Sequence, residues 1–392
     1  MSSPLVSRMQ GFADSIFSEM TQRALQYDAV NLGQGFPDQD TPAALKQIAQ
    51  DQIASGANQY APGIGKPVLR QAIAEHQRRF YGLTVDPDTE VLVTVGATEA
   101  LTATVLALVE PGDEVITFEP FFDIYASAIA VAGGVQRTVP MLFPDFAMDF
   151  DGLKEQINDR TRAIMLNNPH NPTGRVFSEE ELSQLAAIAI QHDLIVISDE
   201  VYEHLVFDGL THTPIAALPG MAQRTLTVSS GGKTFSATGW KVGWVHGNAE
   251  LISAVKAVKQ AMTFAASGPF QDAIAEGLGF SDKFFAAGAE DLQSRRDLLL
   301  AGLTEIGIPF AQPAGTYFVV ADVSGLGGAD ALAFCRRAPK EYGVVAVPVS
   351  AFCATTDHSA SLVRLAYCKR PETISAGIDK LAALAPDPAK MP

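Results

Sequence analysis

Two lysines in a segment rich in glycine and hydroxyl residues are the first candidates for chemistry in this sequence. Lys233 follows two serines and two glycines, shortly after residues 225–228, whose β-branched composition predicts a buried strand. Glycines let the backbone approach a ligand closely. A desolvated amine near a positive charge loses its proton readily, as a Schiff-base lysine requires, and Lys241 can supply that charge or bind a phosphate. The alternative is a surface turn with two solvated lysines, which the candidates below argue against.

A glycine turn earlier in the chain offers a place for an anion. Gly96, Ala97 and Thr98 lie between an apolar stretch, 91–95, and a predicted helix, 100–109. The free N–H groups at a helix start attract phosphate. Such turns are common, so the motif alone is a weak signal.

Several residues near expected strand ends can bind a cofactor ring. Asp199 ends the apolar run 194–198, where a carboxylate can pair with a protonated pyridine nitrogen and keep the ring an electron sink. Its alternative role is a helix cap. Asn171 and Tyr202 can bind a phenolic ring oxygen, although an asparagine before proline is also a turn residue. Phe122 can lie flat against a ring or belong to the core.

Arg364 lies inside an apolar run, residues 362–366. An arginine rarely enters such a run without an anionic partner, and its planar guanidinium binds a carboxylate with two parallel hydrogen bonds. A substrate carboxylate and a structural ion pair are both open at this point.

Two loops rich in glycine and proline complete the set of candidates. Residues 31–38 contain Gly35, where backbone can approach a ligand, or form a plain connector. Residues 58–65 contain Tyr60, which can pack or donate a hydrogen bond to an anion.

Strands and helices alternate from about residue 90, which predicts an α/β fold with a mostly parallel sheet covered by helices on both faces. Ligands bind beyond the carboxyl ends of the strands in such sheets, where the candidate loops lie. We expect an N-terminal arm with part of a small domain at 1–45, a large cofactor-binding domain at 46–285, and a smaller α/β domain at 286–392. The helix-like segment 290–304 and the strand-like segment 316–320 characterise that smaller domain.

Charge and composition narrow the class of protein. The formal net charge of −16 argues against nucleic-acid and anionic-membrane partners, which need clustered Lys and Arg. The three cysteines have no metal-ligand spacing, so we expect no metal and reduced thiols. No secretory signal or apolar run long enough to span a membrane is evident. We therefore expect a soluble cytoplasmic enzyme.

Together these motifs resemble those of the class I aminotransferases, fold type I enzymes that use pyridoxal phosphate. The resemblance covers nearly the whole chain in the family's order, most specifically in residues 167–174, 198–202 and 230–244. It implies a homodimer whose active sites lie at the subunit interface. Two departures are Lys241, where many relatives have arginine, and the glycine pair before Lys233.

The resemblance also implies roles for individual residues. Lys233 would be the Schiff-base lysine and proton carrier, and Asp199 would contact the pyridine nitrogen. The remaining roles are ring-oxygen contacts from Asn171 and Tyr202, ring stacking by Phe122, phosphate contacts from Ala97, Thr98, Ser230 and Lys241, a phosphate contact by Tyr60 from the partner subunit, and substrate contacts from Arg364, Gly35 and Asn171.

Two subfamilies share local stretches with the chain. Residues 93–100 and 199–208 are most similar to actinobacterial N-succinyldiaminopimelate aminotransferases of lysine biosynthesis, and residues 31–38 and 119–123 to the kynurenine, glutamine and methionine group. The first implies ping-pong transamination with glutamate as amino donor. Cysteine-conjugate β-elimination is a further alternative. A cofactor-bound transcription regulator and an inactive scaffold are less favoured, because no basic DNA-binding segment precedes the domain and Lys233, Asp199 and Arg364 are all present.

Overall fold

The computed structural model describes residues 4–12 and 15–383 of the chain. Its strands are β1 Val30–Asn31, β2 Val91–Val95, β3 Glu114–Glu119, β4 Val135–Pro140, β5 Thr161–Asn167, β6 Ile195–Asp199, β7 Thr225–Ser230, β8 Val242–Gly247, β9 Phe318–Asp322, β10 Val344–Val345, β11 Val347–Pro348 and β12 Leu362–Ala366.

The α-helices are α1 Ile16–Tyr27, α2 Ala43–Ala54, α3 Pro67–Tyr81, α4 Gly96–Leu108, α5 Ile124–Ala132, α6 Phe150–Gln156, α7 Glu179–Gln191, α8 Gly231–Thr234, α9 Ala249–Met262, α10 Gly268–Leu278, α11 Asp282–Glu305, α12 Ala331–Glu341 and α13 Pro371–Ala382. Short 3-10 turns are η1 Ser7–Phe12, η2 Ile215–Ala217, η3 Thr238–Trp240, η4 Ser324–Leu326 and η5 Val349–Phe352.

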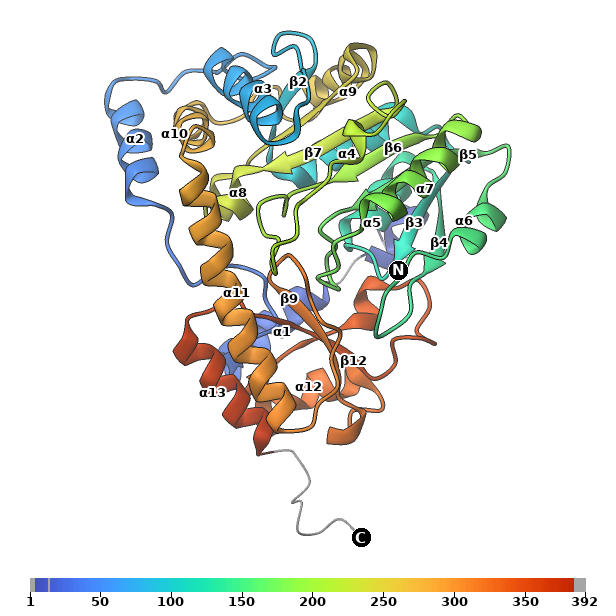
Figure 1. Ribbon diagram of the computed structural model, residues 1–392, viewed down its shortest axis with the longest axis vertical. Coiled ribbons are helices and arrows are strands. Elements are labelled where there is room, and N and C mark those ends of the chain that lie inside the picture. Colours follow the sequence, from blue (N-terminus) through green and yellow to red (C-terminus); the bar gives the residue numbers. More distant parts are fainter. Residues whose placement is uncertain (1–3, 13–14, 384–392) are drawn as a thin grey trace.

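A seven-stranded sheet in the order β2-β8-β7-β6-β5-β3-β4 forms the upper half of the molecule in Figure 1. Strand β8 runs antiparallel to both of its neighbours, and the other pairings are parallel. The predicted α/β class with a mostly parallel sheet is therefore confirmed. Parallel neighbours need crossover connections, which the intervening helices supply.

Helices cover both faces of this sheet, and successive residues of each strand point to opposite faces. Val115 of β3 packs in a cluster with α4, α5 and α9, whereas its neighbour Ile116 packs in a second cluster with α6 and α7. Near β2 and β8, a third cluster joins α2, α3 and α10. Burial on both faces explains why central strands such as β6, Ile195–Asp199, carry apolar residues in succession rather than alternating in polarity.

The reversed direction of β8 brings Lys241 to the edge where the parallel strands end. Val242 pairs with Val95 at the end of β2, and Gly243 pairs with Ser230 at the end of β7. Lys241 precedes β8 directly, in the left-handed conformation with φ of 53°. It therefore lies beside the turn that follows β2 and the turn that carries Lys233.

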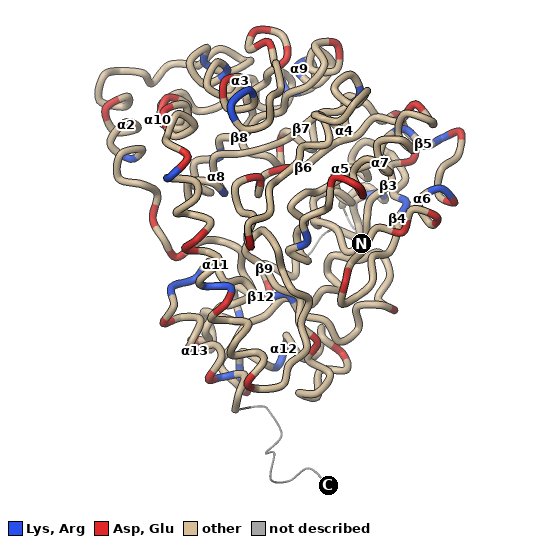
Figure 2. The backbone as a smooth tube through the Cα atoms, viewed as in Figure 1, with Lys and Arg blue, Asp and Glu red and all other residues tan. Residues whose placement is uncertain are grey.

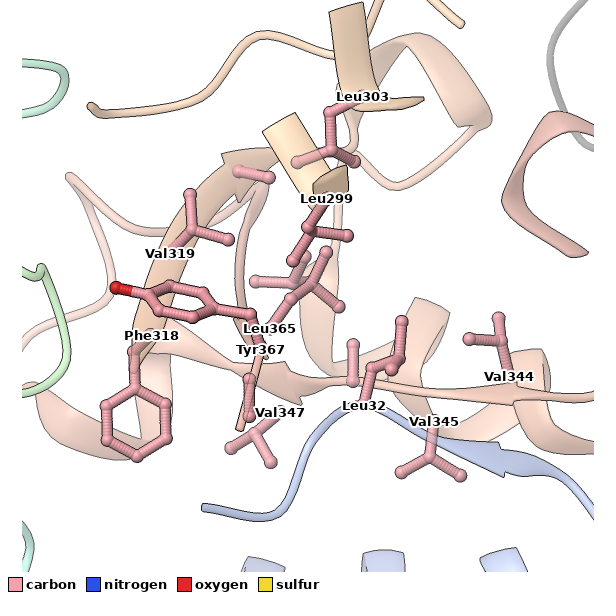
Figure 3. Packing of buried hydrophobic residues seen from close by; sticks show 14 of the residues in the cluster. Leu32, Leu299, Leu303, Phe318, Val319, Val344, Val345, Val347, Leu365 and Tyr367 are labelled. Atoms are coloured by element: carbon pink, nitrogen blue, oxygen red, sulfur yellow. The ribbon is translucent and has the colours of Figure 1, made fainter. Parts of the chain in front are cut away.

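A smaller antiparallel sheet, β11-β12-β9, lies in the lower half of Figure 1 among α1, α11, α12 and α13. Its core, shown in Figure 3, contains Leu299 and Leu303 from α11 against Val319 and Leu365 from the sheet. The central strand β12 holds Arg364, which pairs in register with Val347 and Val320. β12 is thus the strand that the apolar run around Arg364 predicts.

Several expected boundaries differ from the structure. The predicted helix 290–304 is the later part of α11, which spans 24 residues and extends from one half of the molecule to the other in Figure 1. The divisions expected at 45/46 and 285/286 fall within α2 and α11. The strand expected from residue 316 begins at Phe318, because Thr316 adopts φ of 65°, outside the extended region. The division into domains stays a prediction; residues 1–3, 13–14 and 384–392, which it includes, lie outside the described part.

No helix within residues 4–12 and 15–383 is long and apolar enough to cross a membrane. Figure 2 shows Lys and Arg dispersed among Asp and Glu over both halves of the molecule. Several are paired across elements, as in the contact of Arg336 with Glu19 and that of Arg137 with Glu114.

Candidate active site

A cavity of about 400 Å³ lies at the carboxyl edge of the large sheet and is closed on one side by the smaller sheet. Of the predicted site residues, eleven line it: Gly35, Ala97, Thr98, Phe122, Asn171, Asp199, Tyr202, Ser230, Lys233, Lys241 and Arg364. Tyr60 does not line it in this chain. Its ring is 86% exposed and packs edge-on against Phe264.

Lys233 projects into the cavity from α8, the single helical turn that directly follows β7. Its Nζ donates to the hydroxyl of Tyr317 over 2.9 Å. Burial, followed by the positive charges of Arg364 and Lys241, lowers the lysine pKa to about 8, while Cys368 and Asp199 oppose the shift. The neutral amine that nucleophilic chemistry requires is therefore far more populated near neutral pH than in an ordinary lysine.

Asp199 is the last residue of β6 and is 3% exposed. Its Oδ2 accepts a 2.7 Å hydrogen bond from the hydroxyl of Tyr125, a residue of α5. Burial raises the pKa of Asp199 to about 6, and the Tyr125 bond partly offsets this rise. A cation placed at the free side of the carboxylate would stabilise its charged form.

The start of α4 and the start of β8 together form an anion-binding corner. The amides of Ala97 and Thr98 lie in the first turn of α4, where N–H groups have no helical acceptor. Gly243 allows the close approach, since a Cβ there would be 2.6 Å from the nitrogen of Ala97. The Nζ of Lys241 lies against Gly96, so its positive charge faces the same corner.

Arg364 is held at the opposite side of the cavity and is 3% exposed. It donates to Asn171 Oδ1 over 3.1 Å and to the carbonyl of Gly33 over 2.9 Å. The ring of Phe318 lies 4.0 Å from the guanidinium carbon. Burial lowers the arginine pKa to about 10. Within the described residues Arg364 forms no salt bridge, and its Nε has no partner, so the structural ion pair left open by the sequence is not formed.

Gly35 belongs to a loop that passes directly over the smaller sheet. A Cβ at this position would overlap the ring of Phe318, so only glycine fits without a shift. The carbonyl of Gly35 accepts a 2.7 Å hydrogen bond from the Tyr317 hydroxyl, which itself accepts from Lys233. Tyr317 therefore connects this loop to the lysine.

Sequence reasoning missed Tyr317, Tyr125 and Phe318 as site residues. One signal in the sequence could have pointed to the hydrogen bond between Tyr125 and Asp199. Tyr125 lies three residues after the predicted site residue Phe122, at the start of a helix. Tyr317 and Phe318 stood within the expected strand 316–320, where aromatic residues predict only packing. Phe17, Asp123 and Ile124 also line the cavity without having been predicted.

Comparison with known proteins identifies the family. The sequence matches the family described as aminotransferase class I and II over residues 27–381. The chain belongs to the class I and II aminotransferases. Over 395 residues it is 50% identical to the probable N-succinyldiaminopimelate aminotransferase DapC of Mycobacterium tuberculosis, covering 98% of this chain and 99% of that protein.

A further relative and a solved structure support this aminotransferase assignment. The methionine aminotransferase of Escherichia coli is 39% identical over 383 residues, covering 97% of this chain and 99% of that protein. The solved structure of N-succinyldiaminopimelate aminotransferase from Mycobacterium tuberculosis matches with a TM-score of 0.95 at 51% identity, covering 97% of this chain and 100% of that chain. The protein is a pyridoxal phosphate-dependent aminotransferase, a class of enzyme whose substrates are amino acids and 2-oxo acids.

The chemistry of the cavity fits this cofactor. An aldehyde needs an amine, and Lys233 offers one whose pKa is lowered to about 8 chiefly by burial. A phosphate needs N–H donors and positive charge, which the first turn of α4 and Lys241 supply. A protonated pyridine nitrogen needs a buried carboxylate, and Asp199 has one oxygen facing Tyr125 and lines the cavity. The groups that pyridoxal phosphate requires are therefore present together.

Proposed function

We propose that this aminotransferase interconverts N-succinyl-LL-diaminopimelate and its 2-oxo acid, with glutamate and 2-oxoglutarate as the second pair. The similarity that supports this substrate is 50% identity over nearly the full length of a protein named for it. The observation that carries the reaction type is a buried arginine without a carboxylate partner among the described residues, in one cavity with the Lys233 amine.

The proposed cofactor contacts follow from positions around the cavity. Lys233 binds the aldehyde carbon, Asp199 the pyridine nitrogen, and Phe122 the ring face. The other proposed contacts are Asn171 and Tyr202 to the ring oxygen, and Ala97, Thr98, Ser230 and Lys241 to the phosphate. When bound, the cofactor supplies an aldehyde that takes the amino group and a ring that accepts electrons from the substrate Cα.

In this proposal Arg364 binds the substrate and Lys233 transfers its proton. Arg364 binds the α-carboxylate with two parallel hydrogen bonds and so fixes the Cα atom near Lys233. The Nζ of Lys233, freed when the substrate amine takes its place on the cofactor, would accept the Cα proton as a general base and then, as a general acid, deliver it to the carbon that had carried the aldehyde. Asp199 stays charged and holds the proton on the pyridine nitrogen.

A ping-pong order follows from the use of one carboxylate site. Donor and acceptor both carry an α-carboxylate, and Arg364 binds each in turn, so one product leaves before the second substrate enters. We also propose a homodimer, in which the exposed Tyr60 reaches the phosphate of the partner subunit, and a cytoplasmic location, in keeping with three free cysteines.

A half-reaction assay tests the substrate proposal. Candidate amino donors are added singly to purified holoenzyme without acceptor, while the absorbance of the bound cofactor is followed. Fast conversion by N-succinyl-LL-diaminopimelate and glutamate, with slow conversion by methionine and kynurenine, is the expected result. The opposite ranking would overturn the substrate but keep the reaction type.

A methionine-type specificity is the second candidate. The rings of Phe17, Phe122 and Phe318 line the cavity, and such rings favour an apolar side chain. In the same assay, this candidate requires methionine to be the fastest donor.

A further inference from the structure

A second cluster of reactive side chains lies behind the segment that carries Asp199 and Tyr202. His76, on α3, meets His204, which follows β6 in the sequence, with 2.7 Å between their Nε2 atoms. The carboxylate of Glu203 lies beside them, and one ligand atom from each of the three residues falls within 4.8 Å of the others. The cluster thus joins two elements that are distant in the chain.

Aromatic rings pack against this cluster, and the hydroxyl of Tyr81 and the positive charge of Arg79 also lie near it. The imidazole of His204 stacks on the ring of Phe285, with centroids 4.2 Å apart, and the ring of Phe80 lies 4.8 Å from both imidazoles. Glu203 accepts a 2.5 Å hydrogen bond from the hydroxyl of Ser229. Ligands that are held in place by packing and by hydrogen bonds are typical of metal centres in proteins.

The two imidazoles present the atoms that a transition metal binds. Two Nε2 atoms at 2.7 Å cannot both carry a proton, so at least one offers a lone pair. A tetrahedral zinc ion bound at roughly 2.0–2.1 Å to two nitrogens separates them by about 3.3 Å, so a small ring displacement of about 0.6 Å admits the ion.

We propose that His76, Glu203 and His204 form a binding site for a divalent transition-metal ion such as zinc. Two imidazole nitrogens and one carboxylate oxygen supply three ligands, and solvent supplies the fourth. Access comes from a second cavity of about 470 Å³ that is lined by His204, Pro42 and Ser236. None of the three ligands is a proposed cofactor contact, although Lys233 also lines this second cavity, and the site does not depend on the proposed substrate.

The position of the site gives the ion a structural effect. His76 belongs to α3, whereas Glu203 and His204 directly follow Tyr202, a proposed cofactor contact. A bound ion therefore links α3 to the end of β6 and stabilises the folded state, because the unfolded chain does not bring these residues together.

Calorimetric titration of the pyridoxal phosphate-loaded enzyme with zinc chloride tests the proposal. We expect one ion per chain and a rise in melting temperature with zinc but not with magnesium, which prefers oxygen ligands. His76→Gln and His204→Gln should each weaken zinc binding at least about tenfold. His192→Gln and His358→Gln, which alter exposed histidines, are matched controls and should bind zinc as the wild type does.

Absence of zinc binding to the wild type would overturn the site. Zinc binding that survives both cluster variants would identify an adventitious surface site and overturn it equally. Should the variants fold poorly, cobalt provides a test on the wild-type protein alone. Cobalt bound in a site of low symmetry with nitrogen ligands should give visible absorption bands in addition to the cofactor band. The absence of these bands would also contradict the proposal.

Discussion

At the scale of single residues, the hydroxyl of Tyr317 has two bonds in the site. It accepts from Lys233 and donates to the carbonyl of Gly35, so it sets the position of the amine relative to the substrate loop. We expect Tyr317→Phe to lower kcat by about 10- to 100-fold, since a misplaced general base loses rate steeply. The Michaelis constant for the amino donor should change less. Steady-state kinetics with the preferred donor measures both quantities.

Tyr367→Phe is the matched control for this variant. Tyr367 is also a buried tyrosine, and its hydroxyl donates to the carbonyl of Gly315 over 3.2 Å. Loss of that bond should cost about 1 kcal/mol of stability without changing kcat. If Tyr317→Phe instead raised the Michaelis constant alone, Tyr317 would support only the substrate loop.

The sequence predicts the residues whose neighbours in the chain carry a signal. Lys233 stands in a glycine-rich segment, Asp199 ends an apolar run, and Arg364 is a charge within one. Tyr317 gives no such signal, because its contact with Lys233 spans 84 residues and exists only after folding. The contact between the Phe318 ring and the Arg364 guanidinium could not be predicted for the same reason, because the sequence indicates only that Phe318 is a core residue of a strand.

At the scale of elements, the close packing of β8 on α4 sets the shape of the anion-binding corner. A Cβ added at Gly243 would lie 2.5 Å from the carbonyl carbon of Gly96, so the first turn of α4 must shift. We expect Gly243→Ala to raise the dissociation constant of pyridoxal phosphate roughly tenfold, in line with an overpacking cost of about 1–3 kcal/mol. Titration of apoenzyme with cofactor, followed by absorbance, measures it.

Gly288→Ala is a suitable control because nothing lies within 4 Å of the added carbon. In an exposed helix interior, alanine is preferred over glycine by about 1 kcal/mol, so this variant should be slightly more stable and bind cofactor normally. Equal cofactor affinity in both variants would show that the β8–α4 contact does not shape the phosphate site.

The elements themselves were predicted to different extents. The alternation of apolar runs and helices predicted the parallel part of the large sheet. This was possible because strands that are buried on both faces stand out as apolar runs. Strand β8, Val242–Gly247, was not foreseen, since its first residues, 242–244, were assigned to the lysine motif and reversal of direction has no local signature. Helix α11 is longer than its expected part. Its first turns pack through Phe285 on Phe80 of α3, a contact that has no local signature in the sequence.

At the scale of the whole molecule, the exposure of Tyr60 bears on the assembly. A residue that contacts the cofactor phosphate should line the cavity, yet Tyr60 lies outside it and is 86% exposed. In the proposed homodimer the partner's Tyr60 completes each site. Tyr60→Ala should therefore weaken cofactor binding by at least about tenfold, although Tyr60 does not line the cavity of its own chain.

Mixed dimers separate this shared site from an indirect effect. Lys233→Ala should abolish transamination, because the proposed proton carrier is lost, and Tyr60→Ala should reduce activity at limiting cofactor. In a dimer with one chain of each variant, one site combines an intact Lys233 with an intact Tyr60 and the other has neither.

Equal mixing should thus restore about a quarter of the wild-type activity, because half of the dimers are mixed and each has one complete site. If Tyr60 acted within its own chain, every site in the mixture would lack one of the two residues, and mixing would restore nothing. Steady-state assays after unfolding and co-refolding the two variants, with size-exclusion chromatography of the product, distinguish these outcomes.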